Sequence, residues 1–561
     1  MKFHWSVLAA SFATVACTGS VPSPGNAGDD GGGGNEGGSA GEPGEGGTAG
    51  GGTPDLGEMP LRRLTKWEYE NTIKELLGAP PSYAKAYPSD DIGKVGFATA
   101  TNTSELMATA TMESADALAR FALTKFDTLV PCSASGTDAC AKDFIATFGQ
   151  RAFRRPLTTT ERAELFDLFN GVRTNVGLDF RNGLRVVLTA ILQAPQFLYH
   201  WQTGDEGLVS DASGTARLGN YQLAARLSYF LWGSMPDPDL FAAAAGGKLT
   251  EGDELEKQAR RLMSDTRARA MVSDFFTQLL YLDAVTRSEK DQTAHPEWTA
   301  TVRASALAES RNFVQSVVFD GDGLWRTVLT APYSWIDESL AKVYGLGNVR
   351  GSTLARQDLP KAQRAGLLTQ PAFLAAQSGP ADGALVTPIH RGHLVRKRLL
   401  CQTIPPPMAN IVSRASTGTT TRERLKSHVS DPQCASCHSL MDDLGFAFEN
   451  YDATGKWRTT DNGKTIDASG EISALESGRP KFNNAVELVN ILAETPEANE
   501  CMVSNLIRYG LGRLDTEGEA RKLLPNGMGT SSELNVREAM IKVVASRGFS
   551  QRLLSKGEVL P

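Results

Sequence analysis

A glycine-rich acidic segment at residues 18–58 decides which part of the chain can fold. It holds 17 of the 55 Gly and seven Asp or Glu, and it contains no Lys, Arg or aromatic residue. Such a segment buries too little apolar surface to offset the entropy lost on ordering. We therefore expect a disordered linker with a root-mean-square reach of ~35 Å. The folded body is expected to begin at residue 59.

The formal charge is divided unevenly between these two parts. The whole chain carries −7, but residues 59–561 hold 56 Lys and Arg against 57 Asp and Glu. A nearly neutral body lacks the broad positive field that nucleic-acid binding needs, so we expect no nucleic-acid partner. No run of 18 or more apolar residues occurs, so no membrane-spanning helix is expected.

The first 17 residues have the pattern of an export signal. Lys2 precedes a short segment rich in apolar residues, and small residues lead up to Cys17. Thr14-Val15-Ala16-Cys17 resembles a bacterial lipoprotein box, although Thr14 stands where Leu is usual. We expect lipidation of Cys17 and membrane contact through that lipid only. The expected location is the periplasm, outer membrane or cell surface of a Gram-negative bacterium. The alternative is an ordinary cleaved signal peptide.

From residue 59 on, apolar residues recur mostly at helical spacing. Capping boxes at Thr65–Glu68 and Thr158–Glu161 predict two helix starts, and Gly78 predicts the end of the first helix. Asn220 is expected to cap a helix that runs to Trp232. Strand signals are sparse, and the clearest is the Asn462-Gly463 turn of a small hairpin. These patterns predict a mainly α fold of several consecutive small helical domains.

One motif carries chemistry: Cys434-Ala435-Ser436-Cys437-His438. C-x-x-C-H is the attachment sequence of c-type haem, because two thiols reach the porphyrin vinyl groups and the adjacent His reaches the iron. We predict one covalent haem c on Cys434 and Cys437, with His438 as axial ligand. A thioredoxin-like redox pair would need a βαβ pattern, and a zinc site would need further ligands. A plain disulfide would leave His438 without a role.

The other cysteines form an even set in an oxidising compartment. Cys132, Cys140, Cys401 and Cys501 remain after Cys17, Cys434 and Cys437 are removed, and four cysteines permit three pairings. The short spacing favours a Cys132–Cys140 bridge. This leaves a Cys401–Cys501 bridge that would enclose the haem motif.

The remaining haem contacts are less defined. The sequence does not distinguish among the candidates for the sixth iron ligand, which are Met528, Met502, Met408 and His428. Met528 lies in the loop 525–529, which could wrap over the haem. Trp457 and Arg458 are candidates for contacts with the haem propionates. The alternative for this pair is an ordinary turn with a core tryptophan.

The body resembles the planctomycete-type cytochrome group, which comprises large exported bacterial proteins assembled from consecutive domains of unknown function. The resemblance is carried by residues 61–65 with Glu68-Tyr69, 148–158, 226–232, 364–370, 387–392, 444–452, 455–458 and 508–513. One departure is Met441-Asp442-Asp443, where the family usually has Ile-Asp-Pro. The resemblance implies an exported cytochrome but no assigned substrate.

Together these patterns predict the following segments and domains. They are a signal peptide at 1–17, the linker at 18–58, helical domains at 59–131, 132–216 and 217–350, a domain with the haem c motif and a small hairpin at 351–480, and a helical domain at 481–561.

The first functional hypothesis is electron transfer to or from a redox partner protein at the cell envelope. The second is a haem-dependent oxidative enzyme that acts on an extracellular substrate. The third is a surface binding or assembly lipoprotein with a structural haem. The sequence assigns no catalytic residue, because it contains no phosphate loop, nucleophile elbow or HExxH motif.

Overall fold

The computed structural model describes residues 56–59, 61–87, 90–100, 104–200, 209–210, 214–378, 388–405, 418–430, 432–524 and 534–554. The chain forms two units, 1–51 and 52–561, and all described residues belong to the second. The expected signal peptide with Cys17 lies outside the described residues, and so does the expected linker except for its end. In that end, Leu56 is buried and Glu58 forms a parallel bridge with Leu553.

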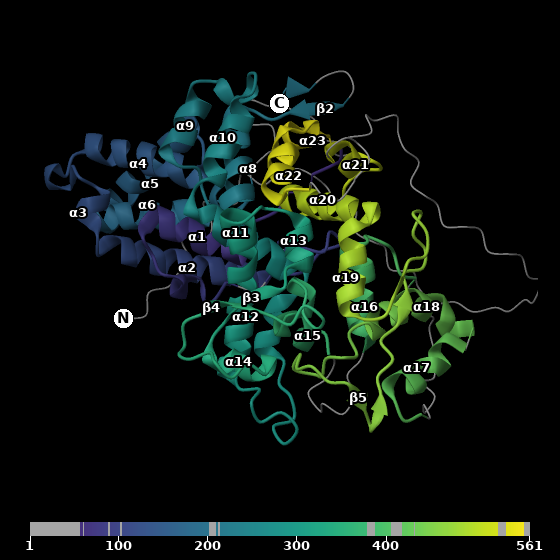
Figure 1. Cartoon of the computed structure of the whole chain (residues 1–561). Coiled ribbons are helices and arrows are strands. Elements are labelled where there is room, and N and C mark those ends of the chain that lie inside the picture. Colours follow the sequence, from purple (N-terminus) through teal and green to yellow (C-terminus); the bar gives the residue numbers. More distant parts are fainter. Residues whose placement is uncertain are drawn as a thin grey trace, which may run out of the picture. The chain divides into compact units, whose positions relative to one another are not determined.

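The helices α1 (Lys66–Leu77) and α5 (Thr159–Val176), labelled in Figure 1, begin where their capping boxes predict. Thr65 accepts a hydrogen bond from the Glu68 amide, and Glu68 accepts one from the Thr65 amide at 2.8 Å. Gly78 ends the first helix in the left-handed conformation, with φ of 67°. The helices are α1 (Lys66–Leu77), α2 (Glu105–Leu123), α3 (Phe126–Leu129), α4 (Asp138–Phe153), α5 (Thr159–Val176), α6 (Phe180–Gln193) and α7 (Pro195–Leu198). Their apolar faces enclose one hydrophobic core.

A second, larger core is built from the helices that follow. The first of these are α8 (Asn220–Trp232), α9 (Pro238–Ala245), α10 (Glu254–Met263), α11 (Thr266–Leu279), α12 (Ala300–Gln315), α13 (Trp325–Thr330), α14 (Glu338–Tyr344) and α15 (Pro371–Ala376). The predicted cap of α8 is wrong by one residue. Gly219 is the cap, because the Asn220 side chain instead accepts a hydrogen bond from the Leu249 amide at 2.8 Å.

The C-terminal part contributes to the same larger core. Its helices are α16 (Pro388–Leu394), α17 (Thr421–Ser430), α18 (Pro432–Phe446), α19 (Ala485–Glu494), α20 (Pro496–Leu511), α21 (Glu519–Leu523), α22 (Val536–Ala545) and α23 (Arg547–Ser550). A π-helical turn over Val395–Leu399 extends α16. No helix in the described ranges is long and apolar enough to cross a membrane.

The strands are short and antiparallel. They pair as β1 (Val209–Ser210) with β2 (Thr215–Arg217) and β9 (Gln551–Leu553), β3 (Tyr333–Ile336) with β4 (Ala355–Asp358), β5 (Thr460–Asp461) with β6 (Lys464–Thr465), and β7 (Gly470–Glu471) with β8 (Lys481–Phe482). In the predicted hairpin, Asp461 lies opposite Lys464, and both turn residues have positive φ, 48° at Asn462 and 80° at Gly463. The expected mainly helical fold is confirmed.

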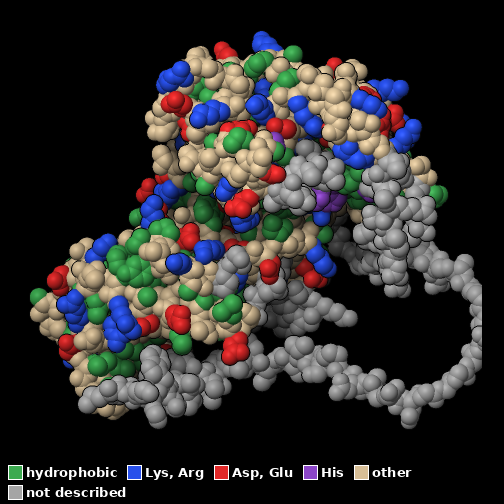
Figure 2. Space-filling view, turned by 90° about the horizontal axis from the view of Figure 1, so that it is seen from below, with side chains coloured by type: hydrophobic (Ala, Val, Ile, Leu, Met, Phe, Trp, Pro, Cys, Tyr) green, Lys and Arg blue, Asp and Glu red, His purple; other side chains and the backbone are tan. Residues whose placement is uncertain are grey.

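Charges of both signs are interspersed over the face shown in Figure 2. Lys and Arg do not gather there into a single basic patch. This distribution agrees with the nearly neutral charge of residues 59–561.

Candidate functional site

The Cys-x-x-Cys-His sequence lies in the first half of α18. Pro432 occupies the first position of this helix, where its missing N–H is tolerated. The helix was not predicted, because Cys, Ser, His and Asp favour helix only weakly. Residues three and four apart lie on the same helix face, so Cys434, Cys437 and His438 share one face. All three are partly buried.

Cys434 and Cys437 are not joined in a disulfide. The other four described cysteines are paired as Cys132–Cys140 and Cys401–Cys501, the pairing that the sequence favours. The Cys437 thiol donates to the Pro405 carbonyl at 3.2 Å. Neither thiol of the motif is therefore part of a disulfide, as thioether formation requires.

His438 makes a hydrogen bond that the sequence analysis missed. Its Nδ1 lies 2.9 Å from Oδ1 of Asp442, whose side chain is only 3% exposed. With the ring proton on Nδ1, the lone pair of His438 lies on Nε2, the nitrogen that can bind iron. The spacing of four residues would have predicted this contact if the segment had been predicted as a helix. Asp442 is also the residue of the 441–443 segment that agrees with the family pattern.

The helix α18 packs on α16 through two glycines, and the helices lie side by side in Figure 1. A Cβ at Gly392 would lie 1.8 Å from the Met441 carbonyl oxygen. A Cβ at Gly445 would lie 2.0 Å from the Pro388 carbonyl oxygen. The two backbones therefore approach more closely than any other residue pair would allow.

Two buried arginines, on α16 and on the turn that follows it, hold α18 and the segment after it. Arg391 donates to the Leu374 carbonyl at 2.8 Å and to the Phe448 carbonyl at 3.1 Å. Arg396 donates to the Leu440 carbonyl, on α18, at 2.8 Å. Burial lowers the pKa of both guanidinium groups to about 10, so both stay charged at neutral pH. Arg396 thus holds α18 at Leu440, and Arg391 holds the backbone just after the C-terminal end of α18.

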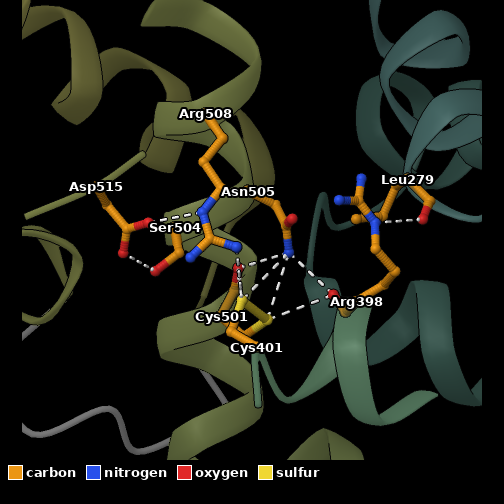
Figure 3. The surroundings of a disulfide bond; sticks show 8 residues. All are labelled: Leu279, Arg398, Cys401, Cys501, Ser504, Asn505, Arg508 and Asp515. Carbon is orange, nitrogen blue, oxygen red and sulfur yellow. Dashed lines mark hydrogen bonds and ion pairs between the residues drawn. A yellow bond between two sulfur atoms is a disulfide. The ribbon is translucent and has the colours of Figure 1, made fainter. Parts of the chain in front are cut away.

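The segment after α16 is anchored to α20 by the Cys401–Cys501 disulfide (Figure 3). Beside it, Asn505 donates to the Arg398 carbonyl at 2.9 Å and to the Cys501 carbonyl at 2.8 Å. The Arg508 guanidinium approaches the Cys401 sulfur at 3.5 Å. The bridge encloses the haem motif, because it joins positions 100 residues apart on either side of it.

Trp457 and Arg458 make internal contacts. Arg458 pairs with the Glu449 carboxylate at 3.1 Å and lies 3.6 Å from the Asp461 carboxylate. Burial raises the pKa of Glu449. The Trp457 ring packs edge-on against Tyr451, with centroids 5.3 Å apart. A contact with haem propionates remains a prediction.

The candidates for the sixth iron ligand are not brought together with the motif by any observed contact. Met502 is buried in the larger core, on α20. Met408 and Met528 lie outside the described residues, and so does the side chain of His428. The identity of the sixth iron ligand therefore stays a prediction.

A second polar cluster lies around a cavity of about 20 Å³, room for roughly one water molecule. Tyr509 donates to Asp274 at 2.8 Å, and burial raises the pKa of Asp274 to about 6. Arg62 and His200 both contact Glu68 at 3.2 Å. Burial opposes ionisation of Glu68, but these two partners hold its pKa well below the usual range. Sequence analysis missed this cluster because its members come from distant segments.

Within the described ranges, no group of three or more His, Cys, Asp or Glu side chains is arranged to hold a metal ion. The motif itself offers a thiol pair and one imidazole. That donor set matches a covalent haem.

Four family models match consecutive segments of the chain, and each is described as a protein of unknown function. They are PSD3 (DUF1587) at residues 62–124, PSD5 (DUF1595) at 140–201, PSD4 (DUF1592) at 218–346 and PSCyt3 (DUF1588) at 364–461. The last segment contains the Cys-x-x-Cys-His helix, and its family name is cytochrome-like. Neither curated proteins nor solved structures gave a match. The chain belongs to the planctomycete-type group of multi-domain, cytochrome-like proteins.

Proposed function

We propose that this protein is an exported monohaem c-type cytochrome that transfers electrons at the cell envelope. One observation carries the proposal. Cys434 and Cys437 are free thiols one helical turn apart beside His438, whereas every other described cysteine is in a disulfide.

The residues of α18 fit the attachment chemistry. Each thiol would add across one vinyl group, so that sulfur bonds to one carbon and hydrogen to the other, without net oxidation. The hydrogen bond to Asp442 orients the His438 ring with its Nε2 lone pair available for iron. When bound, the haem would supply a one-electron ferric–ferrous couple.

The surroundings of α18 would keep this ligand geometry fixed while the charge of the iron changes. The glycine contact between Gly392 and Met441 leaves no room for the helix to slide toward α16. Arg396 donates to the Leu440 carbonyl of the helix, and Arg391 donates to the Phe448 carbonyl just beyond its end. A ligand held by packed, hydrogen-bonded groups is the arrangement that a reversible redox site needs.

Two features support export and a protein partner. Disulfides persist in oxidising compartments, and the body has two of them. Lipidation of Cys17 would then anchor the protein through the linker. We propose a redox partner protein, and the nearly neutral charge of residues 59–561 gives no electrostatic basis for a nucleic-acid partner.

The test is to produce the protein with haem-maturation machinery and to stain denatured protein for covalent haem. Wild-type protein should stain and should give the reduced-minus-oxidised spectrum of haem c. The C434S/C437S variant should lose the stain. The matched control C132S/C140S also lacks two cysteines and should keep it. Wild-type protein without covalent haem would refute the proposal.

The His438–Asp442 contact favours a second candidate, an oxidative haem enzyme acting on an extracellular substrate. A carboxylate partner makes a histidine ligand more basic, which suits activation of peroxide or oxygen. Carbon monoxide added to the reduced protein separates the two functions. A changed spectrum would support the enzyme, and an unchanged one would support the electron carrier.

A further inference from the structure

The Asp442 carboxylate is buried on α18, and burial of a carboxylate does not stabilise a helix. Its side chain is 3% exposed, and Oδ2 is buried without a hydrogen-bond partner among the described residues. A buried carboxylate with an oxygen that accepts no hydrogen bond lowers the stability of the folded protein unless a partner group interacts with its charge. His438, at 2.9 Å, is the hydrogen-bond partner that the structure gives this carboxylate.

The neighbouring Asp443 has the same charge but different surroundings. Its side chain is 40% exposed, its Oδ2 accepts a hydrogen bond from the Glu471 amide at 3.2 Å, and Arg422 lies 4.0 Å from its Oδ1. The charge of Asp443 is therefore compensated by the backbone, a cation and solvent. The charge of Asp442, in contrast, lies against the imidazole of His438.

The chemical consequence concerns the His438 ring. A carboxylate that accepts the Nδ1 proton draws that proton toward itself and increases the electron density on Nε2. A more basic Nε2 binds ferric iron more strongly than ferrous iron, since the ferric state carries one more positive charge. Low exposure strengthens this effect, because solvent screens a buried charge less than an exposed one.

We propose that Asp442 is a positioning residue that fixes the Nδ1–H tautomer of His438 and lowers the reduction potential of the bound haem. This inference rests on the proposed function, because it requires haem iron on His438. A lowered reduction potential implies a redox partner that exchanges electrons at low potential.

The experiment compares D442N with D443N, two variants that each remove one negative charge from the same helical turn. Holoprotein is titrated spectroelectrochemically at fixed applied potentials. D442N should raise the ferrous-to-ferric ratio about tenfold at a given potential, because loss of such a ligand partner weakens metal binding by about tenfold or more and the loss falls mainly on the ferric state. D443N should change the ratio less than twofold. Equal shifts in the two variants, or no shift in D442N, would overturn the proposal.

A second readout does not need haem. Nitrogen NMR of wild-type, haem-free protein should show His438 protonated on Nδ1, and D442N should weaken that preference. Protonation on Nε2 in the wild type would overturn the inference. A wild-type protein that takes up no haem would instead refute the proposed function, so the two failures are distinguishable.

Discussion

Removing the Cys401–Cys501 disulfide should destabilise the part of the protein that carries the candidate haem site. The bridge restricts the unfolded chain, and the restriction grows with the length of the loop that it closes. This loop spans 100 residues and contains α17 and α18, whereas the Cys132–Cys140 loop spans only 8. The chain-entropy relation gives ~4.7 kcal/mol for the long loop and ~2.5 kcal/mol for the short one.

The perturbation is the double variant C401S/C501S, and C132S/C140S is its matched control. Serine is nearly isosteric with cysteine, and the hydrogen bonds of Asn505 to the Arg398 and Cys501 carbonyls involve backbone oxygens that both variants keep. The folded structure around the bridge should therefore survive. The loss should then arise mainly in the unfolded state.

Native-state hydrogen exchange at increasing urea concentration measures the free energy of regional unfolding. Peptides from α18 and α20 should lose about 4.7 kcal/mol in C401S/C501S and should be little affected in C132S/C140S. Peptides from α4 should show the smaller loss in the control variant. If C401S/C501S loses no more than the control does, the loop-length reasoning is wrong.

Three further predictions concern single residues. Gly392→Ala should lower the free energy of unfolding by about 3 kcal/mol in urea titrations, because its Cβ would meet the Met441 carbonyl oxygen at 1.8 Å. Gly171→Ala, in the open middle of α5, should instead raise it by about 0.5–1 kcal/mol; a loss at both sites would contradict the steric argument. Burial raises the pKa of Asp274 from its usual value of 3.8 to about 6 in the folded protein, so the contribution of Asp274 to stability falls as pH rises between these values. Asp274→Asn should therefore be more stable than wild type by about 3 kcal/mol at pH 8. If thermal melts show the same difference in stability between variant and wild type at pH 4, the burial effect is disproved.

Much of the helical architecture could be read from short-range patterns. The capping boxes at Thr65 and Thr158 work because a side chain and an amide three residues apart meet within one turn. The Asn462-Gly463 hairpin follows from two residues that accept positive φ. These features depend on neighbours in sequence, so the sequence suffices.

Other features could not be read in this way. The helix α18 forms from weak helix formers because it packs closely on α16 through Gly392 and Gly445. The cap of α8 moved from Asn220 to Gly219 because Leu249 competes for the Asn220 side chain. In both cases a residue distant in sequence changes the local preference.

The sequence by itself determined the spacing of Cys434, Cys437 and His438, and that spacing is the basis of the proposed haem attachment. Count and spacing also favoured one of three pairings of the remaining cysteines, and the structure has that pairing. Only the tertiary structure decided that Asp442 is buried against His438 and that Asp274 meets Tyr509. Burial and the charge of a partner depend on which distant segments exclude water, and no short-range pattern encodes that.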